Sequence, residues 1–256
     1  METQREYRIL VVNDDGIFAP GIKHLASIAA KFGEVVVVAP DSPRSGQSHA
    51  VTLVQPLRLN EAGQEGNIRY FSCSGTPADC VKLAIKVVYG GQLPDYIFSG
   101  INHGSNASSN AVYSGTVAGM MEAALTGVPS VAFSLTDHSL KADFSPFLPY
   151  VEKIMAACIQ SGQKNICWNV NCPDRADLKG IKVCRQAKAF WDEDAVERTD
   201  PARRKYYWLM GDFINQDKGT DHDLFYLDEG YITLTPFHFD WTDYPELERL
   251  QKSGLF

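Results

Sequence analysis

The sequence predicts a doubly wound, mostly parallel, Rossmann-like three-layer α/β sandwich that carries a C-terminal, β-containing arm. Over the first hundred residues, runs of β-branched residues alternate with helical patterns, which is typical of a parallel sheet covered by helices on both faces. The chain has 256 residues and 45% hydrophobic content, enough to bury a full core without disulfides or a structural metal. Beyond about residue 189 this alternation stops, and charged and aromatic residues become dense.

The first strand-helix-strand unit is predicted over residues 8–38. Residues 8–12 (RILVV), in which four apolar residues follow Arg8, predict the opening strand. Pro20 suits the first turn of a helix, apolar residues then recur at helical spacing, and Gly33 is expected to end that helix. The valines at 35–38 predict a second, buried strand.

A polar loop, a hairpin and a second helix are expected next. Residues 41–48 form the loop, and the extended stretches 51–59 and 68–72, with glycine and asparagine between them, predict a hairpin. Thr76 and Asp79, with a proline directly after the threonine, resemble a capping box at a helix start. This second helix is expected to run to about residue 88.

The remaining elements complete the predicted doubly wound core and lead into the tail. A Gly/Asn/Ser-rich loop is expected over residues 100–114. Around it, the patterns predict strands at 96–98, 131–133, 168–170 and 181–183, helices at about 116–125 and 147–159, and a late strand at 231–235 without a following crossover helix. We therefore expect a catalytic core over residues 1–190 and a C-terminal extension, acting as an oligomerisation arm, over residues 191–256.

Charge and composition restrict the class of partner. The net charge is -7, so the chain lacks the basic surface that drives binding to nucleic acid polymers, and any nucleotide is expected to be a small ligand. No stretch approaches the roughly 20 apolar residues that span a bilayer, and no secretory segment is evident, which predicts a cytoplasmic protein without a membrane partner. The six cysteines form no CxxC pair and are expected to be buried thiols.

Polar residues at predicted strand ends are the strongest chemical signal, because ligands of open α/β sheets bind there. Asp14 and Asp15 follow the first strand, Ser45 follows the second, and Asn102 follows the strand at 96–98. Adjacent carboxylates repel one another unless a cation compensates, and oxygen donors of this kind suit Mg²⁺ or Mn²⁺. These residues are therefore candidate metal ligands, although Asp-Asp-Gly equally fits a simple turn into the next helix.

A candidate phosphate site follows the same loop. Ser114, Gly115 and Thr116 open a predicted helix, whose unpaired amides and dipole favour an anion, and Asn106 could donate a further hydrogen bond. The alternative is a plain helix cap without a ligand.

Other nucleotide and hydrolase signatures are absent from the sequence. There is no GxGxxG after the first strand, no GxxxxGK[ST], no GxSxG elbow and no HExxH. The missing glycine fingerprint argues against a nucleotide-dependent oxidoreductase or transferase on the same core. A non-catalytic, metal-dependent nucleotide sensor stays open as an alternative to a phosphatase.

Several motifs, in order along nearly the whole chain, resemble the stationary-phase survival protein SurE family. They are residues 9–22 (ILVVNDDGIFAPGI), 39–48 (APDSPRSGQS), 75–81 (GTPADCV), 99–106 (SGINHGSN), 113–118 (YSGTVA), 168–173 (WNVNCP), 207–211 (YWLMG) and 230–236 (GYITLTP). His103 is a departure, because many relatives have a small residue after the site asparagine; this bears on substrate preference and pH optimum rather than on the reaction.

The resemblance implies a divalent-metal-dependent 5'-nucleotidase acting on nucleoside monophosphates, often also on 3'-monophosphates and in some members on short polyphosphate. Carried over by position, one Mg²⁺ or Mn²⁺ would be held by Asp14, Asp15, Ser45 and Asn102, of which the two aspartates and Asn102 would also serve catalysis. Asn106 and the turn at 114–116 would line the phosphate pocket. Family members are dimers or tetramers with an exchanged C-terminal arm, which implies a homodimer or homotetramer here.

Overall fold

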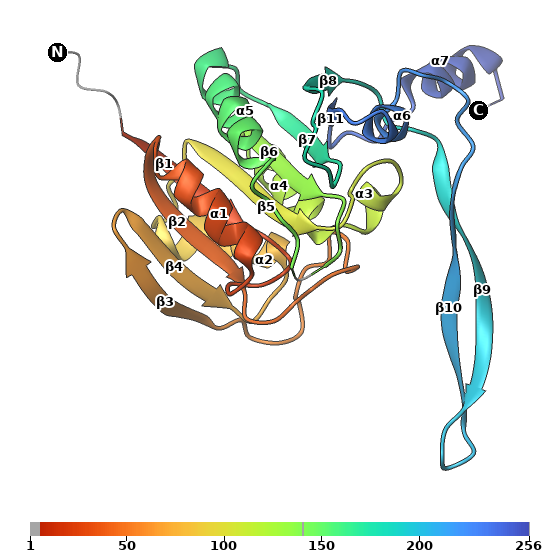
Figure 1. Cartoon of the computed structure of the whole chain (residues 1–256), viewed down its shortest axis with the longest axis horizontal. Helices are drawn as coiled ribbons and strands as arrows, with labels where there is room; N and C mark the ends of the chain where they lie inside the picture. Colours follow the sequence, from red (N-terminus) through yellow and green to blue (C-terminus); the bar gives the residue numbers. More distant parts are fainter. Residues whose placement is uncertain (1–5, 140, 256) are drawn as a thin grey trace.

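The protein, described by a computed structural model over residues 6–139 and 141–255, is built around a nine-stranded mixed sheet (Figure 1). The strand order is β3-β4-β2-β1-β5-β6-β7-β11-β8, and the central pairs from β4 through β7 are parallel. The strands are β1 (Tyr7–Val12), β2 (Gly33–Pro40), β3 (Leu59–Glu65), β4 (Ile68–Cys73), β5 (Tyr96–His103), β6 (Ser130–Leu135), β7 (Cys167–Cys172), β8 (Ile181–Val183) and β11 (Ile232–Pro236). The predicted doubly wound α/β class is confirmed.

Helices cover both faces of this sheet. On one face, α1 (Pro20–Ala29) and α5 (Leu148–Ser161) pack over an apolar cluster that includes Phe98, Phe133 and Phe147. On the other face, α2 (Pro77–Leu83), the π-helical turn η1 (Ala84–Val88) and α4 (Gly115–Leu125) cover the second row of strand side chains. The central strands are buried on both sides, which explains their continuous β-branched runs.

The structure differs from the predicted element bounds in two places. The hairpin strand expected at 51–59 begins only at Leu59, and residues 51–58 are irregular because they close over the start of α2 through Thr52 and Asp79. The loop expected from residue 100 begins later, since β5 continues to His103. A short helix, α3 (Asn110–Tyr113), then lies inside that loop.

Part of the C-terminal region belongs to the main sheet, which the sequence did not indicate. β11 lies between β7 and β8 in the main sheet, antiparallel to β7 and parallel to β8, so this part of the expected 191–256 appendage belongs to the core layer. Between β8 and β11, β9 (Ala189–Thr199) and β10 (Lys205–Asn215) form a separate two-stranded hairpin that projects far from the sheet (Figure 1). Two helices complete the region: α6 (Asp223–Asp228) and the exposed α7 (Tyr244–Ser253).

The cysteines and the helices bear on two sequence expectations. All six cysteines are buried and unbridged, which confirms the prediction of buried thiols. Among the helices of the described residues, none is long and apolar enough to cross a bilayer.

Candidate metal and phosphate site

The end of β1 presents two carboxylates side by side. Asn13 shapes the turn: its side-chain amide donates to the Gly16 carbonyl (3.1 Å), and its side-chain oxygen accepts from the Gly16 amide (3.2 Å). Asp14 is 3% exposed, and Asp15 is partly buried. The turn therefore closes on itself through Asn13 and leaves both carboxylates available to other partners.

Asn102 reaches the same place from the neighbouring strand. The register between β5 and β6 shifts between Ser99 and Asn102, where Gly100 has φ +122° and a side chain would collide with the Phe133 carbonyl. The Asn102 side-chain amide donates to the Gly104 carbonyl (2.8 Å), which fixes the orientation of the side chain. Its side-chain oxygen accepts a long hydrogen bond from the Thr116 hydroxyl and has a second lone pair for a cation or another donor.

The start of α4 faces Asp14. The Thr116 hydroxyl donates to the Asp14 carboxylate and lies 3.4 Å from the Asn102 side-chain oxygen. The Ser114 hydroxyl caps the helix by accepting from the Val117 amide (3.0 Å). A Cβ atom on Gly115 would come within 2.7 Å of the Asp14 side chain, so this close approach needs glycine.

Burial and mutual repulsion oppose the charge of both carboxylates. Desolvation raises the pKa of Asp14, and the hydrogen bond from Thr116 acts in the opposite direction. The pKa of Asp15 is raised to about 6, first by desolvation and then by the charge of Asp14, while a hydrogen bond from the His103 amide (3.2 Å) lowers it. Neither carboxylate pairs with a lysine or arginine anywhere in residues 6–139 and 141–255.

The loop after β2 completes the same edge of the sheet. The Arg44 amide donates to the Asp14 carbonyl (2.7 Å), which ties the loop to β1. The Arg44 guanidinium is directed elsewhere, toward the Ser74 carbonyl (2.9 Å) and Asp41 (3.7 Å). Ser45 is exposed and lines the same cavity as Asp14.

These side chains border one cavity of about 500 Å³, a size typical of small-molecule sites. Its lining includes five of the predicted site residues. They are Asp14, Ser45, Asn102, Asn106 and Ser114. Three further predicted residues lie directly behind this lining. Asp15 accepts a hydrogen bond from the amide of the lining residue His103, and Gly115 and Thr116 contact the lining residue Asp14.

Asn106 is held by a buried amide network that the sequence did not indicate. Its backbone amide donates to Asn171 and its carbonyl accepts from Asn169, each at 2.8 Å, and its side-chain amide donates to Ser134 (2.8 Å). One hydrogen of that side-chain amide is free of these bonds. The network therefore fixes the side chain at the cavity wall and leaves one donor for a ligand.

Other lining residues were missed by sequence reasoning. Asn110 and Tyr113 come from α3, His138 from the loop after β6, and Trp191 and Glu193 from the base of the β9–β10 hairpin. Only the density of aromatics after residue 189 could have drawn attention to Trp191, since nothing in the sequence places that hairpin beside the sheet edge.

The donor set suits a hard divalent cation. Two carboxylates, an oriented amide oxygen and a hydroxyl are oxygen ligands of the kind that Mg²⁺ and Mn²⁺ prefer. Among the described residues, no group of three or more His, Cys, Asp or Glu side chains is placed to hold a metal, so amide, hydroxyl or water oxygens would have to complete the shell. The buried, uncompensated pair of carboxylates fits such an ion.

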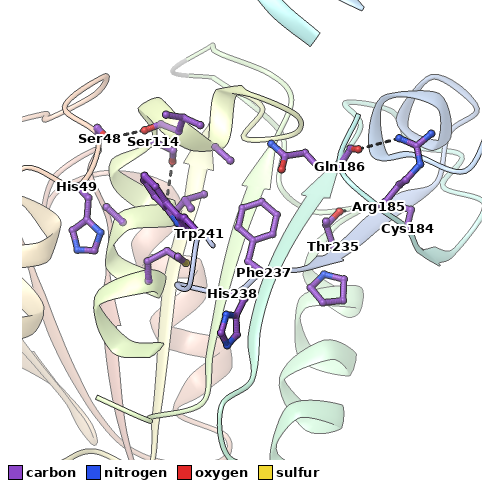
Figure 2. Close-up of a pocket in the computed structure, with 16 residues that line it drawn as sticks. Ser48, His49, Ser114, Cys184, Arg185, Gln186, Thr235, Phe237, His238 and Trp241 are labelled. Carbon is purple, nitrogen blue, oxygen red and sulfur yellow. Dashed lines mark hydrogen bonds between the residues drawn. The ribbon is translucent and has the colours of Figure 1, made fainter. Parts of the chain in front are cut away.

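A second cavity of about 570 Å³ lies on another side of α4, and Figure 2 shows Phe237 and Trp241 among its lining side chains. It is mainly apolar, and its polar members include His49, Arg185 and His238. No carboxylate of the described residues lines it, and it shares only Ser114 with the first cavity. Of these two cavities, only the first is therefore lined by carboxylates that could hold a metal ion beside a phosphate.

Comparison with known proteins identifies the relatives of this chain. Residues 9–193 match the family model described as Survival protein SurE. The chain is 48% identical over 251 residues to the protein named 5'-nucleotidase SurE of Flavobacterium psychrophilum, covering 96% of this chain and 97% of the relative. It is also 48% identical over 251 residues to the protein of that name from Cytophaga hutchinsonii, with 97% of each chain covered.

A solved structure extends the likeness to three dimensions. The crystal structure of the SurE protein from Aquifex aeolicus superposes with a TM-score of 0.81 at 35% identity, covering 95% of this chain and 98% of that one. Sequence and fold are thus matched over nearly the whole length, and the chain belongs to the SurE family.

Proposed function

We propose that this protein is a divalent-metal-dependent phosphomonoesterase that hydrolyses nucleoside 5'-monophosphates to nucleoside and phosphate. The observation that carries the proposal is the pair of adjacent carboxylates, Asp14 buried and facing the start of a helix and Asp15 partly buried, without a lysine or arginine partner among the described residues. The names of the relatives, 5'-nucleotidase SurE, support the same activity. We include 3'-monophosphates and short polyphosphate as secondary substrates of the same site.

In this proposal Asp14, Asp15, Ser45 and Asn102 hold one Mg²⁺ or Mn²⁺. When bound, such an ion polarises a phosphoryl oxygen, offsets charge on the transferring group and lowers the pKa of water. The hydrogen bond from the Asn102 amide to Gly104 keeps its oxygen directed toward Thr116, whose hydroxyl donates to Asp14, so this side chain is oriented before substrate arrives.

The chain's own residues position the phosphate ester and accept a proton from the attacking water. The amides at the start of α4 and the free hydrogen of Asn106 donate to phosphoryl oxygens, which aligns the phosphorus with its attacking water. The water oxygen bonds to phosphorus as the bond to the nucleoside oxygen breaks, and that oxygen takes up a proton from solvent water and leaves as a hydroxyl group. Asp14 or Asp15 accepts a proton from the attacking water, since Asp14 lines the cavity, Asp15 lies directly behind its lining, and both have a raised pKa.

Phosphate release from a panel of 5'- and 3'-nucleoside monophosphates tests this function. Purified protein is assayed after EDTA treatment and again with added Mg²⁺ or Mn²⁺. We expect no release in EDTA and metal-restored release from 5'-monophosphates. Binding of nucleotide without release under any metal would instead favour the nucleotide sensor.

We also propose that the β9–β10 hairpin assembles the protein into a homodimer or homotetramer. Four consecutive large apolar side chains on β10 are strongly exposed: Tyr207, Trp208, Leu209 and Met210 are between 57% and 70% exposed. Exposed apolar surface of this extent marks interaction sites. A monomeric mass by light scattering at micromolar concentration would contradict the assembly.

A further inference from the structure

Trp191 is an aromatic ring placed in the wall of the proposed phosphoryl site by a distant part of the chain. It lies on β9, yet it lines the same cavity as Asp14, Asn102 and Ser114. Trp191 is 42% exposed, and its ring nitrogen is hydrogen-bonded.

Two contacts hold the indole in place. Its ring N–H donates to the Asn110 side-chain oxygen (2.8 Å), which ties β9 to α3. Phe213 on β10 packs against it, with ring centroids 5.3 Å apart and an interplanar angle of 52°, and is not among the residues lining the cavity. The polar atom of the ring is thus satisfied, and what the ring offers the cavity is an apolar π surface.

The spacing along the chain suits a nucleotide. Asn110 precedes Ser114 by about one helical turn, a rise of roughly 5.4 Å. In a nucleoside monophosphate, one ribose separates phosphate from base. A phosphate at the start of α4 would therefore place its base near the Trp191 and Asn110 side of the cavity. Glu193, two residues along β9, faces the same cavity and offers carboxylate oxygens suited to ribose hydroxyls.

We propose that Trp191 is a nucleobase-stacking residue, so that the base of the β9–β10 hairpin forms the base subsite of this active site. The inference rests on the proposed nucleotidase function and adds a residue that selects nucleotides over phosphate esters without a base. Stacking of a base on an aromatic side chain is worth roughly 5- to 150-fold in affinity by alanine substitution and is tolerant of base identity. The site would therefore accept several bases.

The test compares two substrates that share the sugar phosphate and differ in the base. Adenosine 5'-monophosphate and ribose 5-phosphate are assayed with Mn²⁺ for the wild type, Trp191→Ala, Trp191→Phe and the control Trp241→Ala. Trp241 is an 83% exposed tryptophan that lies outside the hairpin and does not line this cavity. The ratio of kcat/KM for the two substrates is expected to fall at least about fivefold in Trp191→Ala, mainly through KM, and to be largely retained in Trp191→Phe and in the control.

The outcomes separate this inference from the proposed function. An unchanged ratio in Trp191→Ala, including an equal loss of activity on both substrates, would overturn the base subsite and leave the nucleotidase standing. Absence of release by the wild type from both compounds would overturn the nucleotidase. Calorimetric affinity for adenosine 5'-monophosphate then decides the subsite: weaker binding by Trp191→Ala supports it, and equal binding or no binding by the wild type refutes it.

Discussion

Asp15→Asn should stabilise the metal-free protein while removing its response to metal. The substitution preserves size and shape, and the asparagine oxygen can still accept from the His103 amide. It removes one of two neighbouring negative charges that lack a lysine or arginine partner among the described residues. In a protein whose site is built for a cation, the empty site is the less stable state, and a neutral isostere relieves that cost.

The magnitude follows from the pKa of Asp15. A shift from the ordinary value of 3.8 to about 6 disfavours the ionised form by about 3 kcal/mol as an order of magnitude. Because the pKa is raised in the folded state, this cost is fully present above about pH 6 and absent below about pH 3.8. At pH 7.5 in EDTA we therefore expect Asp15→Asn to be about 1–3 kcal/mol more stable than wild type, which raises Tm by several degrees.

Thermal unfolding in EDTA and in Mn²⁺ provides the assay, with Asp212→Asn as a control for net charge. Asp212 is an exposed residue of β10, away from the cavity lining. Metal at a hundredfold excess over its Kd should stabilise the wild type and the control by about 2.7 kcal/mol and Asp15→Asn by much less. If Asp15→Asn were no more stable than wild type in EDTA, or gained as much from Mn²⁺, the assignment of a destabilising carboxylate pair would be refuted.

Two further substitutions test the surroundings of the site. Gly115→Ala should lower kcat/KM by at least about tenfold, because its Cβ would come within 2.7 Å of the Asp14 side chain; a phosphate-release rate equal to wild type would contradict that close approach. Asp79→Asn should cost about 1–3 kcal/mol in urea unfolding at pH 7, because Asp79 accepts hydrogen bonds from Thr52 and Thr76. Since those bonds outweigh burial and lower the pKa of Asp79, the cost should shrink below about pH 3.8, and a cost that stayed constant there would argue against the charged form.

Local signals in the sequence were sufficient for most of the fold. Valine runs located the buried strands, and the capping box at Thr76 and Asp79 located the start of α2, with both reciprocal hydrogen bonds present. The same signals failed where tertiary contacts decide the structure. Residues 51–58 have strand-like composition, but they lie as irregular chain because the Thr52 amide and hydroxyl bind Asp79. β11 lies in the main sheet, although the sequence pattern gave no crossover helix that would have predicted this position.

The candidate site was predictable only in its sheet-edge half. Strand-end reasoning brought Asp14, Asp15 and Asn102 together because parallel strands present their carboxyl ends on one edge. The same reasoning could not predict that Trp191 lies at this site, because the direction of a hairpin depends on long-range hydrogen bonds and packing rather than on the local sequence pattern. Nor could it find Asn171, a polar residue inside a buried strand whose partner is a loop 65 residues earlier.

The anchor that couples the hairpin to the site is the buried carboxylate of Asp223. One of its oxygens accepts from the Ser108 amide (2.7 Å), in the loop that carries Asn106, and the other accepts from the Ala187 amide (2.9 Å), just before β9. The Ser108 hydroxyl donates in turn to the Ala187 carbonyl (2.9 Å). One side chain from the C-terminal region thus fixes the phosphate-side loop and the start of the hairpin in a single geometry. Since β9 then carries Trp191 into the cavity, the arm proposed for assembly and the wall proposed for base recognition are positioned by the same hydrogen bonds.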